Sequence, residues 1–338
     1  MPKLKIAVLV DPEAIPPDDP HFEHGEGLLS QEVEFHVAET LREMDHHVAV
    51  MPFQENIHDA IDSLRAYNPE LIFNLTEHHG GDRRKDQHIV SLLELLDFRY
   101  TGTGPEGMIL CRDKALGKAV LRHYGITVPD FVSIPPGKRS IGRPFPFPAI
   151  VKPRFEDGSD GISLRSLVSN REELEDRVAL VHKHMRQPAI CEEYIEGREI
   201  YVGITGNGRL TSYPAREVRF DGPMNGPRFA TSRVKLDEKY RQKWKIDFTD
   251  ARLGDEMDRE AGQIGKQIYR ILQIRDFGRI DMRITKDNQF VFLEANPNPD
   301  LTMGDEIAEA AEKSGVSYEQ LVSRILRHAW SRYENGKA

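Results

Sequence analysis

Apolar segments that alternate with amphipathic ones over the first hundred residues most constrain the fold of this chain. Residues 6–10, 48–51 and 71–75 are short apolar runs that each predict a strand. Between and after them, apolar side chains recur every three or four residues, which is the spacing of one helix face. Strands that alternate with helices favour a doubly wound parallel sheet, which binds ligands at the carboxyl ends of its strands. We therefore expect an α/β substrate domain over residues 1–105.

The rest of the chain lacks this alternation and favours an α+β arrangement with antiparallel strands. We expect strands at residues 149–153, 189–194, 199–205 and 210–213. Ser317, followed three residues later by Gln320, forms a capping box that predicts the start of the last helix. We divide this part into a central subdomain, residues 106–188, and a C-terminal subdomain, residues 189–338, that carries the candidate metal and catalytic residues.

Composition limits the kind of protein. The chain has 338 residues, enough for two or three domains, and no apolar run approaches the roughly 20 residues that span a bilayer. Its first apolar run meets Asp11 and Pro12, where a signal peptide would need small residues. Two cysteines make no disulfide framework, so we expect a cytoplasmic protein. A net charge of −9 predicts neither a nucleic-acid nor a membrane surface.

Residues 279–284 and 290–295 are alternating runs on either side of a polar pair, Asp287 and Asn288. This pattern predicts a β-hairpin, because Asn and Asp tolerate the left-handed backbone of a two-residue turn.

The register of this hairpin places Asp281 opposite Glu294, and Arg279 opposite Asn296. Side chains alternate along a strand, so these four share one face. The other face takes Ile280, Met282, Val291 and Leu293.

Two carboxylates at directly opposed positions destabilise a sheet unless a cation lies between them. Asp281, Glu294 and Asn296 offer only oxygen ligands, which suit Mg²⁺ or Mn²⁺, whereas zinc prefers His or Cys. The hairpin therefore predicts a metal site. The alternative is an ordinary solvated strand face, and a slip of one residue in the turn would put Asp281 and Glu294 on opposite faces.

Residues 156–161 form a candidate phosphate loop after the strand at 149–153. Glycines such as Gly158 let backbone N–H groups surround an anion, although the loop lacks the Gly-Lys-Ser/Thr ending of a Walker motif. Lys152 ends an apolar strand, where a buried lysine needs an anionic partner. A polar turn and a snorkelling surface lysine remain the alternatives.

Residues 189–195 join an apolar strand to a Glu-Tyr-Ile segment, and Glu199 follows shortly after. Hydrogen-bond acceptors beside an apolar patch suit the adenine and ribose of a nucleotide. An edge strand would show a similar pattern.

Six segments, taken in their order along the chain, resemble sequences of the ATP-grasp fold and, within it, of the D-alanine–D-alanine ligase family. These are LLELLDFRYTGTGP, CRDKALGK, FPAIVKPRFEDGSDGIS, ICEEYIEGREIYV, GRIDMRITKDNQFVFLEANPNPDLT and GVSYEQLVSRIL. The resemblance runs from residue 6 to about residue 326 and is least clear over residues 206–250. It implies an N-terminal doubly wound (pre-ATP-grasp) domain, and ATP and two Mg²⁺ ions (or Mn²⁺) as cofactors. A substrate carboxylate becomes an acyl phosphate, which an amine converts to an amide.

The resemblance also implies a role for each matching position. ATP would be bound by Lys114, Lys152, Glu156, Gly158, Glu192, Tyr194, Ile195, Glu199 and Lys235. The two metal ions would be held by Asp281, Glu294 and Asn296. Arg279 would stabilise the reacting carboxylate and the tetrahedral intermediate, and Glu26 would hold the amine of the first substrate. Ser159, with Gly158 before it, stands where the family has a Ser-Ser pair.

Departures from the family pattern fall in the amino-acid pocket and not in the ATP site. Asp300 replaces a glycine whose backbone helps to form the oxyanion hole, and Leu236 replaces a tyrosine. Beyond His79 and Gly80 the family's Glu-Asp-Gly is missing. The pocket therefore does not predict D-alanine specificity and leaves the small-molecule carboxylate and the amine unidentified, while a negative charge near the acceptor favours a cationic amine. The family also suggests a homodimer.

We thus expect an ATP-dependent carboxylate–amine ligase. The alternative is a non-catalytic ATP-binding relative with a sensing role, in which Arg279 beside the metal carboxylates would have no use. A nicotinamide dehydrogenase is disfavoured, because Asp11 and Pro12 follow the first strand in place of a glycine-rich turn.

Overall fold

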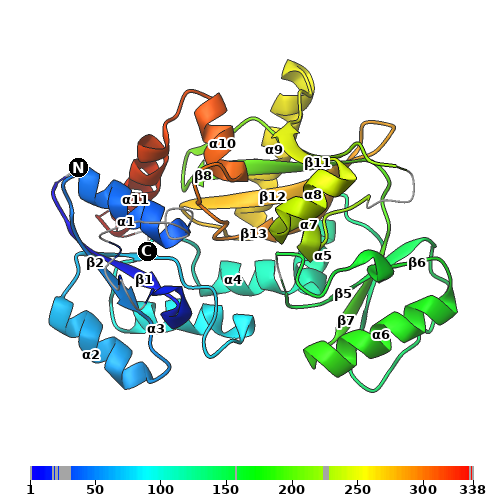
Figure 1. Ribbon diagram of the computed structural model, residues 1–338, viewed down its shortest axis with the longest axis horizontal. Helices are drawn as coiled ribbons and strands as arrows, with labels where there is room; N and C mark the ends of the chain where they lie inside the picture. Colours follow the sequence, from blue (N-terminus) through cyan, green and yellow to red (C-terminus); the bar gives the residue numbers. More distant parts are fainter. Residues whose placement is uncertain are drawn as a thin grey trace.

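The computed structural model arranges the chain around three β-sheets (Figure 1). The structure describes residues 2–16, 19, 22, 32–156, 158–223, 228–334 and 336. The N-terminal sheet has the order β2-β1-β3, and all three strands run parallel. Its strands are β1 (Lys5–Val10), β2 (His47–Pro52) and β3 (Leu71–Asn74).

Helices cover both faces of this sheet. They are α1 (Val33–Glu43), α2 (Ile57–Tyr67), α3 (Asp86–Leu95) and, from the far end of the chain, α11 (Tyr318–Glu334). Ile6 and Val8 of β1 pack into one core with α1 and α11, whereas Ala7 and Leu9 pack into another with α2 and α3. Alternate side chains of a strand point to opposite faces, so one short strand serves both cores. The predicted doubly wound α/β fold is confirmed. Short 3₁₀ turns lie at Pro12–Ala14 and Arg83–Lys85.

The central sheet is antiparallel and has the order β4-β7-β5-β6. It contains β4 (Phe131–Ile134), β5 (Ala149–Pro153), β6 (Leu167–Val168) and β7 (Ala189–Glu193), and α6 (Arg171–Met185) packs on it; a 3₁₀ turn lies at Leu164–Ser166. The boundary predicted between residues 188 and 189 separates β7 from this sheet, although β7 pairs with both β4 and β5. Strand β7 therefore belongs to the central sheet.

The third sheet is the largest, with the order β11-β10-β8-β12-β13 and β9 paired to β8. Its strands are β8 (Arg198–Gly206), β9 (Leu210–Ser212), β10 (Arg216–Phe220), β11 (Ile246–Asp250), β12 (Phe277–Ile284) and β13 (Phe290–Asn296). The helices around it are α4 (Pro105–Arg112), α5 (Lys114–His123), α7 (Ser232–Leu236), α8 (Glu238–Trp244), α9 (Asp255–Ile271) and α10 (Glu306–Lys313).

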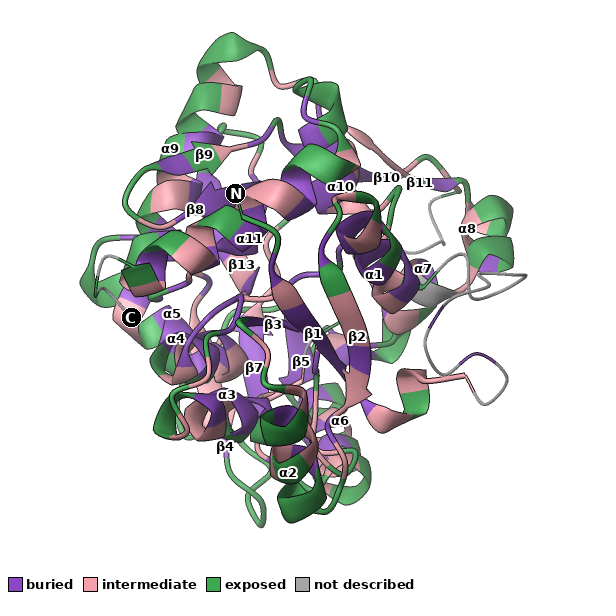
Figure 2. Ribbon diagram, turned by 90° about the vertical axis from the view of Figure 1, so that its left-hand side faces the viewer, coloured by how far each residue is buried: buried purple, intermediate pink, exposed green. Residues whose placement is uncertain are grey.

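Helices pack on both faces of β8, as in the N-terminal sheet. Val202 and Ile204 pack into the core with α9, whereas at Gly203 an added Cβ would lie 2.9 Å from Ile307 of α10. Figure 2 shows buried strands between helices whose outer faces are exposed. Among the described helices none is long and apolar enough to cross a membrane. The predicted capping box is confirmed, because Ser317 and Gln320 bond each other's backbone N–H groups at the start of α11.

Strands β12 and β13 form the predicted hairpin, and its two important pairs are confirmed. Asp281 lies opposite Glu294, and Arg279 lies opposite Asn296. The turn is different from the prediction. Residues 286–288 form a three-residue loop, closed by a 3.0 Å hydrogen bond from the Thr285 N–H to the Gln289 carbonyl.

A β-bulge compensates for the extra loop residue. The register shifts between Asp281 and Met282, so that Met282 pairs with Phe292. Phe292 packs into the core beside Met282, while Leu293 lines a cavity on the other face. The predicted placement of Val291 and Leu293 with Met282 is therefore wrong, because Val291 pairs with Arg283 and Leu293 lines the cavity. The bulge nevertheless returns Glu294 to the face of Asp281.

Candidate active site

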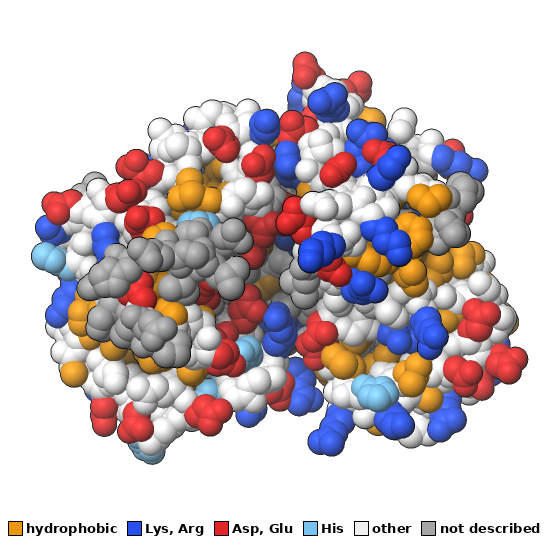
Figure 3. Space-filling view, viewed as in Figure 1, with side chains coloured by type: hydrophobic (Ala, Val, Ile, Leu, Met, Phe, Trp, Pro, Cys, Tyr) orange, Lys and Arg blue, Asp and Glu red, His pale blue; other side chains and the backbone are white. Residues whose placement is uncertain are grey.

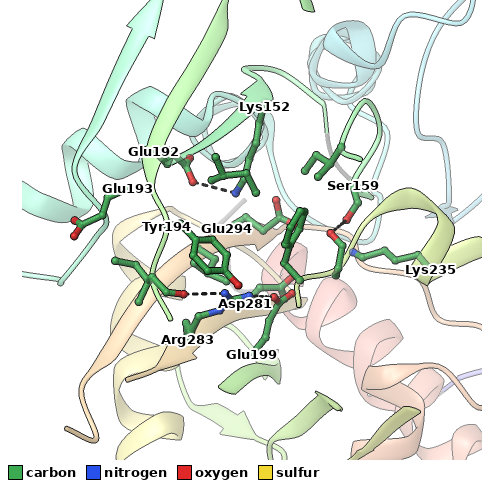
Figure 4. A pocket seen from close by; sticks show the side chains of 16 residues that line it. Lys152, Ser159, Glu192, Glu193, Tyr194, Glu199, Lys235, Asp281, Arg283 and Glu294 are labelled. Carbon is green, nitrogen blue, oxygen red and sulfur yellow. Dashed lines mark hydrogen bonds and ion pairs between the residues drawn. The ribbon is translucent and has the colours of Figure 1, made fainter. Parts of the chain in front are cut away.

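A cavity lies between the central and large sheets, and we call it the inter-sheet cavity (Figure 4). Strands β5 and β7 supply one wall, and β8, β12 and β13 supply the other. Its lining residues are Ile150, Lys152, Ser159, Ile162, Glu192, Glu193, Tyr194, Ile195, Glu199, Phe229, Ala230, Lys235, Asp281, Arg283, Leu293 and Glu294. Nine of the residues predicted from sequence thus meet in one cavity.

Two lysines hold the carboxylate of Glu192 at the base of this cavity. Lys152 Nζ lies 3.0 Å from Glu192 Oε2, and Lys118 Nζ lies 2.9 Å from Oε1. Figure 4 shows Lys152 and Glu192 pointing toward each other. Burial alone would raise the pKa of Glu192, but the two cations hold it at about 2. Glu192 is therefore an ionised, acceptor-only group.

Arg283 organises the opposite wall. Its guanidinium donates to the Ile195 carbonyl at 2.8 Å and to the Glu199 carboxylate. The hydroxyl of Tyr201 donates to the other oxygen of Glu199 at 3.0 Å. Arg283 also lies 5.3 Å from the ring centroid of Tyr194. Acceptor groups fixed beside an aromatic ring suit a sugar hydroxyl and a flat base.

The loop after β5 closes over the cavity. Gly158 and Ser159 both have a positive φ, 57° and 65°. Ser159 Oγ donates to the Ala230 carbonyl at 3.3 Å, and Ser232 Oγ of α7 donates to the Ser159 carbonyl at 2.5 Å. These bonds join the loop to the helix that carries Lys235. Lys235 has no carboxylate within ion-pair distance among the residues that the structure describes.

The carboxylates of the hairpin lie among cations. Lys114 Nζ lies 3.5 Å from Glu294 Oε2, and Asn296 Nδ2 donates to Asp281 Oδ2 at 3.2 Å. Burial would raise the pKa of Glu294, but Lys114 and Lys235 lower it well below its ordinary value. Burial raises the pKa of Asp281 despite its Arg279 partner, and the neighbouring Glu294 adds to the rise.

This donor set fits a magnesium ion. Two carboxylates and one amide are hard oxygen ligands. The mutual repulsion of Asp281 and Glu294 is the feature that a divalent cation would relieve. In the described part of the chain no three His, Cys, Asp or Glu side chains gather as a metal cluster. The site thus depends on two carboxylates and Asn296.

Arg279 is clamped between carboxylates. Its Nε and Nη2 donate to the two oxygens of Asp281 at 2.8 and 3.0 Å, and Nη1 donates to Glu306 Oε2 at 3.1 Å. Its guanidinium also lies 5.1 Å from the Tyr201 ring centroid. These contacts fix a bidentate cation at the edge of the hairpin.

A second, larger cavity of about 910 Å³ lies where the N-terminal unit meets the large sheet, and we call it the junction cavity. Its charged lining residues are Glu77, Arg83, Asp86, Arg112, Asp160, Arg216, Lys235, Arg241, Arg279, Asp300, Asp305, Glu306 and Glu309. Figure 3 shows the surface hollowed between the halves of the molecule, with acidic and basic side chains along the hollow. Because Lys235 lines both cavities, they meet at its side chain.

One end of the junction cavity is acidic. Asp300 accepts hydrogen bonds from the N–H and hydroxyl of Thr302 at 2.8 and 2.6 Å. Burial, together with Glu306 and Asp300, raises the pKa of Asp305 to about 8. Burial, followed by the nearby carboxylates Glu32 and Asp300, raises the pKa of Glu34 to about 7, although Glu34 itself does not line this cavity. This end would be stabilised by a positively charged ligand.

Some predicted residues lie elsewhere. His79 lines a third cavity, beside Phe53, and not the junction cavity that holds Asp300. The Glu156 carboxylate accepts from Gln187 at 2.6 Å and lines neither cavity, although its carbonyl accepts from Lys114. Glu26 lies outside the described residues.

Three residues of the site were missed from sequence. Lys118 lies one helical turn after Lys114, so its spacing was a usable signal. Arg283 lies two residues after Asp281 on one strand, and therefore on the same face. Glu306 had no local signal, because only the tertiary fold brings α10 to Arg279.

Comparisons with known proteins identify the family of this chain. A family model described as the D-ala D-ala ligase C-terminus matches residues 114–327. A Sinorhizobium fredii protein described as uncharacterized protein y4sG is 32% identical over 264 residues, covering 78% of this chain and 75% of its own. A D-alanine–D-alanine ligase of Aquifex aeolicus is 28% identical over 293 residues, covering 86% and 92%.

Solved structures show the same fold. The D-alanine–D-alanine ligase of Bacillus anthracis complexed with ATP matches with a TM-score of 0.72 and 18% identity, covering 98% of this chain and 99% of that one. The fold and site define an ATP-grasp enzyme, a carbon–nitrogen ligase that depends on ATP. Within that class, the chain belongs to the D-alanine–D-alanine ligase family by the match to its C-terminal domain.

Proposed function

We propose that this protein joins a small carboxylate to an amine through an acyl phosphate made from ATP. The place where the two cavities meet carries the proposal. Lys235 lines both cavities, and Arg279 lines the junction cavity while bonded to Asp281, a candidate metal ligand. A triphosphate in the inter-sheet cavity would thus end where a carboxylate in the junction cavity begins.

In the first step a carboxylate oxygen of the substrate attacks the γ-phosphorus, and the bond to the β–γ bridging oxygen breaks to release ADP. Phosphoryl transfer needs mainly positioning and charge neutralisation. Lys114, Lys152 and Lys235 would neutralise the phosphates, while the loop with Gly158 and Ser159 excludes water. Asp281, Glu294 and Asn296 would hold Mg²⁺, which neutralises phosphate charge when bound.

In the second step the amine nitrogen attacks the carbonyl carbon of the acyl phosphate. The C–O bond to phosphate then breaks, an amide forms, and the amine loses its proton to solvent or phosphate. Negative charge develops on the carbonyl oxygen before phosphate leaves. Arg279, fixed by Asp281 and Glu306, would stabilise that oxyanion.

The acceptor end supports a cationic amine over D-alanine. Glu306 and Glu309 lie against Arg279 and Arg216, at 3.1 and 3.7 Å. Asp300 has no ion pair with a cation of the described chain, so it leaves negative charge for a ligand. Asp305 likewise has no such ion pair, and its pKa of about 8 means that a cationic ligand would favour its charged form. We propose an acceptor with a second positive charge, such as a diamine or a basic amino acid.

A product screen tests this function. The purified protein is incubated with Mg²⁺, ATP and pooled D- and L-amino acids, small carboxylates and polyamines. Phosphate release and ligated products are then measured by mass spectrometry. We expect ADP, phosphate and an amide in equal amounts, with basic amines as the best acceptors. If nucleotide binds but no pool provokes phosphate release, the sensing alternative is correct.

A further inference from the structure

Lys118 is a fully buried cation that the proposed reaction does not use. It lies on α5, one turn after Lys114, and its side chain is 0% exposed. Its Nζ lies 2.9 Å from Glu192 Oε1 and donates to the Leu293 carbonyl at 2.5 Å. It also lies 5.4 Å from the ring centroid of Phe292. A buried lysine remains charged only when such partners offset its lost hydration.

The contacts of Lys118 join three elements that come from distant parts of the chain. Glu192 belongs to β7 of the central sheet, and Leu293 belongs to β13 of the large sheet. Leu293 is also the residue next to Glu294, at the bulge that returns Glu294 to the cavity face. Lys118 therefore connects the base of the inter-sheet cavity with the strand that carries the metal carboxylate.

Lys118 does not line the inter-sheet cavity, whereas Lys152, the other cation on Glu192, does. A bound nucleotide can thus touch Lys152 but not Lys118. Any effect of Lys118 on the nucleotide must act through Glu192 or through the backbone at Leu293.

We propose that Lys118 is a positioning residue that fixes the Glu192 carboxylate and the Leu293–Glu294 backbone together, so that base selectivity and metal-dependent phosphate binding are set by one buried contact. This inference rests on the proposed nucleotide site.

The chemistry of Glu192 links Lys118 to base selectivity. An ionised carboxylate accepts hydrogen bonds and donates none. With each oxygen held by one lysine, Glu192 favours an amino group, as on adenine, over a carbonyl, as on guanine. Without Lys118, Oε1 of Glu192 loses its cation and the Leu293 carbonyl loses its hydrogen-bond donor. The Glu192 side chain on β7 and the backbone of β13 at Leu293 are then free to shift.

The main test is the variant Lys118→Met. Methionine has nearly the length and volume of the lysine side chain but carries no charge. Dissociation constants for ATP and GTP are measured by calorimetry over a Mg²⁺ titration, and turnover is measured with the best substrate pair. We expect ATP affinity to fall about 10- to 100-fold, the range that loss of a buried polar partner gives. The preference for ATP over GTP should fall about tenfold or more. The Mg²⁺ concentration that gives half-maximal ATP binding should rise. Because Lys118 touches no reacting atom, kcat should fall much less than kcat/KM.

Arg332→Met provides the matched control. Arg332 Nη2 makes a buried ion pair with Asp276 at 3.0 Å, and neither residue lines either cavity. Both variants remove one buried cation, so both should lower the melting temperature. Of these two variants, only Lys118→Met should change the ratio of the ATP and GTP affinities.

A second variant keeps the inference testable if Lys118→Met does not fold. Glu192→Gln retains the side-chain shape and leaves Lys118 in place. It should reduce the ATP-to-GTP ratio as Lys118→Met does, and adding Lys118→Met to it should reduce the ratio no further. The inference is overturned if a folded Lys118→Met protein binds ATP with wild-type affinity and keeps the wild-type ratio of ATP and GTP affinities. The same result for Glu192→Gln would also overturn it. Failure of the wild-type protein to bind any nucleotide would instead overturn the proposed function.

Discussion

Arg279 neutralises two buried carboxylates, Asp281 and Glu306, and no single substitution preserves both contacts. Lysine keeps the charge but lacks the planar fork of donors that spans them. We expect Arg279→Ala to lower kcat about 10²- to 10³-fold, as removal of an oxyanion donor does elsewhere. Nucleotide binding should be largely retained, because Arg279 does not line the inter-sheet cavity. Phosphate release and nucleotide calorimetry on one preparation check both parts. An equal loss of kcat and of nucleotide affinity would contradict the catalytic role of Arg279.

Asp305 makes the pH dependence of stability predictable. Its pKa is raised by burial, Glu306 and Asp300 from 3.8 to about 8, so between pH 4 and 8 the folded state holds a proton that the unfolded state has lost. Stability contributed by that proton is present at low pH and is lost as the pH rises toward 8. We therefore expect the melting temperature to fall from pH 6 to pH 9.

Asp305→Asn is the test of this assignment. The Asp305 side chain makes no capping bond at the start of α10, so the amide removes the charge without removing a cap. The fall in melting temperature between pH 6 and pH 9 should be smaller in the variant. A parallel fall in both proteins would show that Asp305 is not the titrating group.

At the scale of elements, the hairpin shows how far the sequence could be interpreted. Its polar turn and alternating ends predicted β12 and β13 and the pairing of Asp281 with Glu294. Phe290, Val291, Phe292 and Leu293 are all apolar, so a period of two carries no signal there. The bulge could not be placed for this reason, and the turn was predicted one residue too short. The missed bulge and the missed loop residue cancel each other, so that Glu294 still pairs with Asp281 as predicted.

Helix α5 carries both Lys114 and Lys118, and its first turn is held by Asp113. The Asp113 carboxylate accepts from the N–H groups of Ala115 and Leu116 at 3.1 and 3.0 Å and from Arg154 Nε at 2.7 Å. We expect Asp113→Ala to lower the free energy of unfolding by about 1–2 kcal/mol, the usual cost of a lost N-cap. It should also raise the KM for ATP, because the helix start that places Lys114 is loosened.

Asn170→Ala is the control for this element. Asn170 caps α6 by accepting from the Glu173 N–H at 3.0 Å, and α6 contributes no residue to either cavity. Chemical denaturation should show a similar loss of stability, with the KM for ATP unchanged. A change in KM for both variants would mean that general destabilisation, and not the placement of α5, is responsible.

At the scale of the whole molecule, local patterns predicted the parallel sheet and the general fold but not how distant segments meet. Residues 206–250 gave the weakest signal, yet they supply β10, β11 and the helix that carries Lys235. The sequence also gave no sign that α11 packs on the first sheet, because an amphipathic pattern does not name its partner. Both features depend on contacts between residues far apart in the chain.

Asp276 holds these distant segments together. Its carboxylate accepts from the Gly102 N–H at 2.8 Å, from Asn207 at 2.8 Å and from Arg332 of α11 at 3.0 Å. We expect Arg332→Met to lower the free energy of unfolding by about 3–5 kcal/mol, because a buried carboxylate loses its cation. Denaturant titration measures this value. A loss below about 1 kcal/mol, typical of an exposed pair, would contradict the buried assignment.

Transfer of oxygen from substrate to phosphate tests the acyl-phosphate reaction most directly. The carboxylate substrate found in the product screen is labelled with ¹⁸O at both oxygens and incubated with Mg²⁺, ATP and the acceptor amine. The attacking oxygen leaves with phosphate in the second step, so the account predicts one ¹⁸O atom in each released phosphate and one in the amide. Unlabelled phosphate, formed while ATP is consumed, would contradict it.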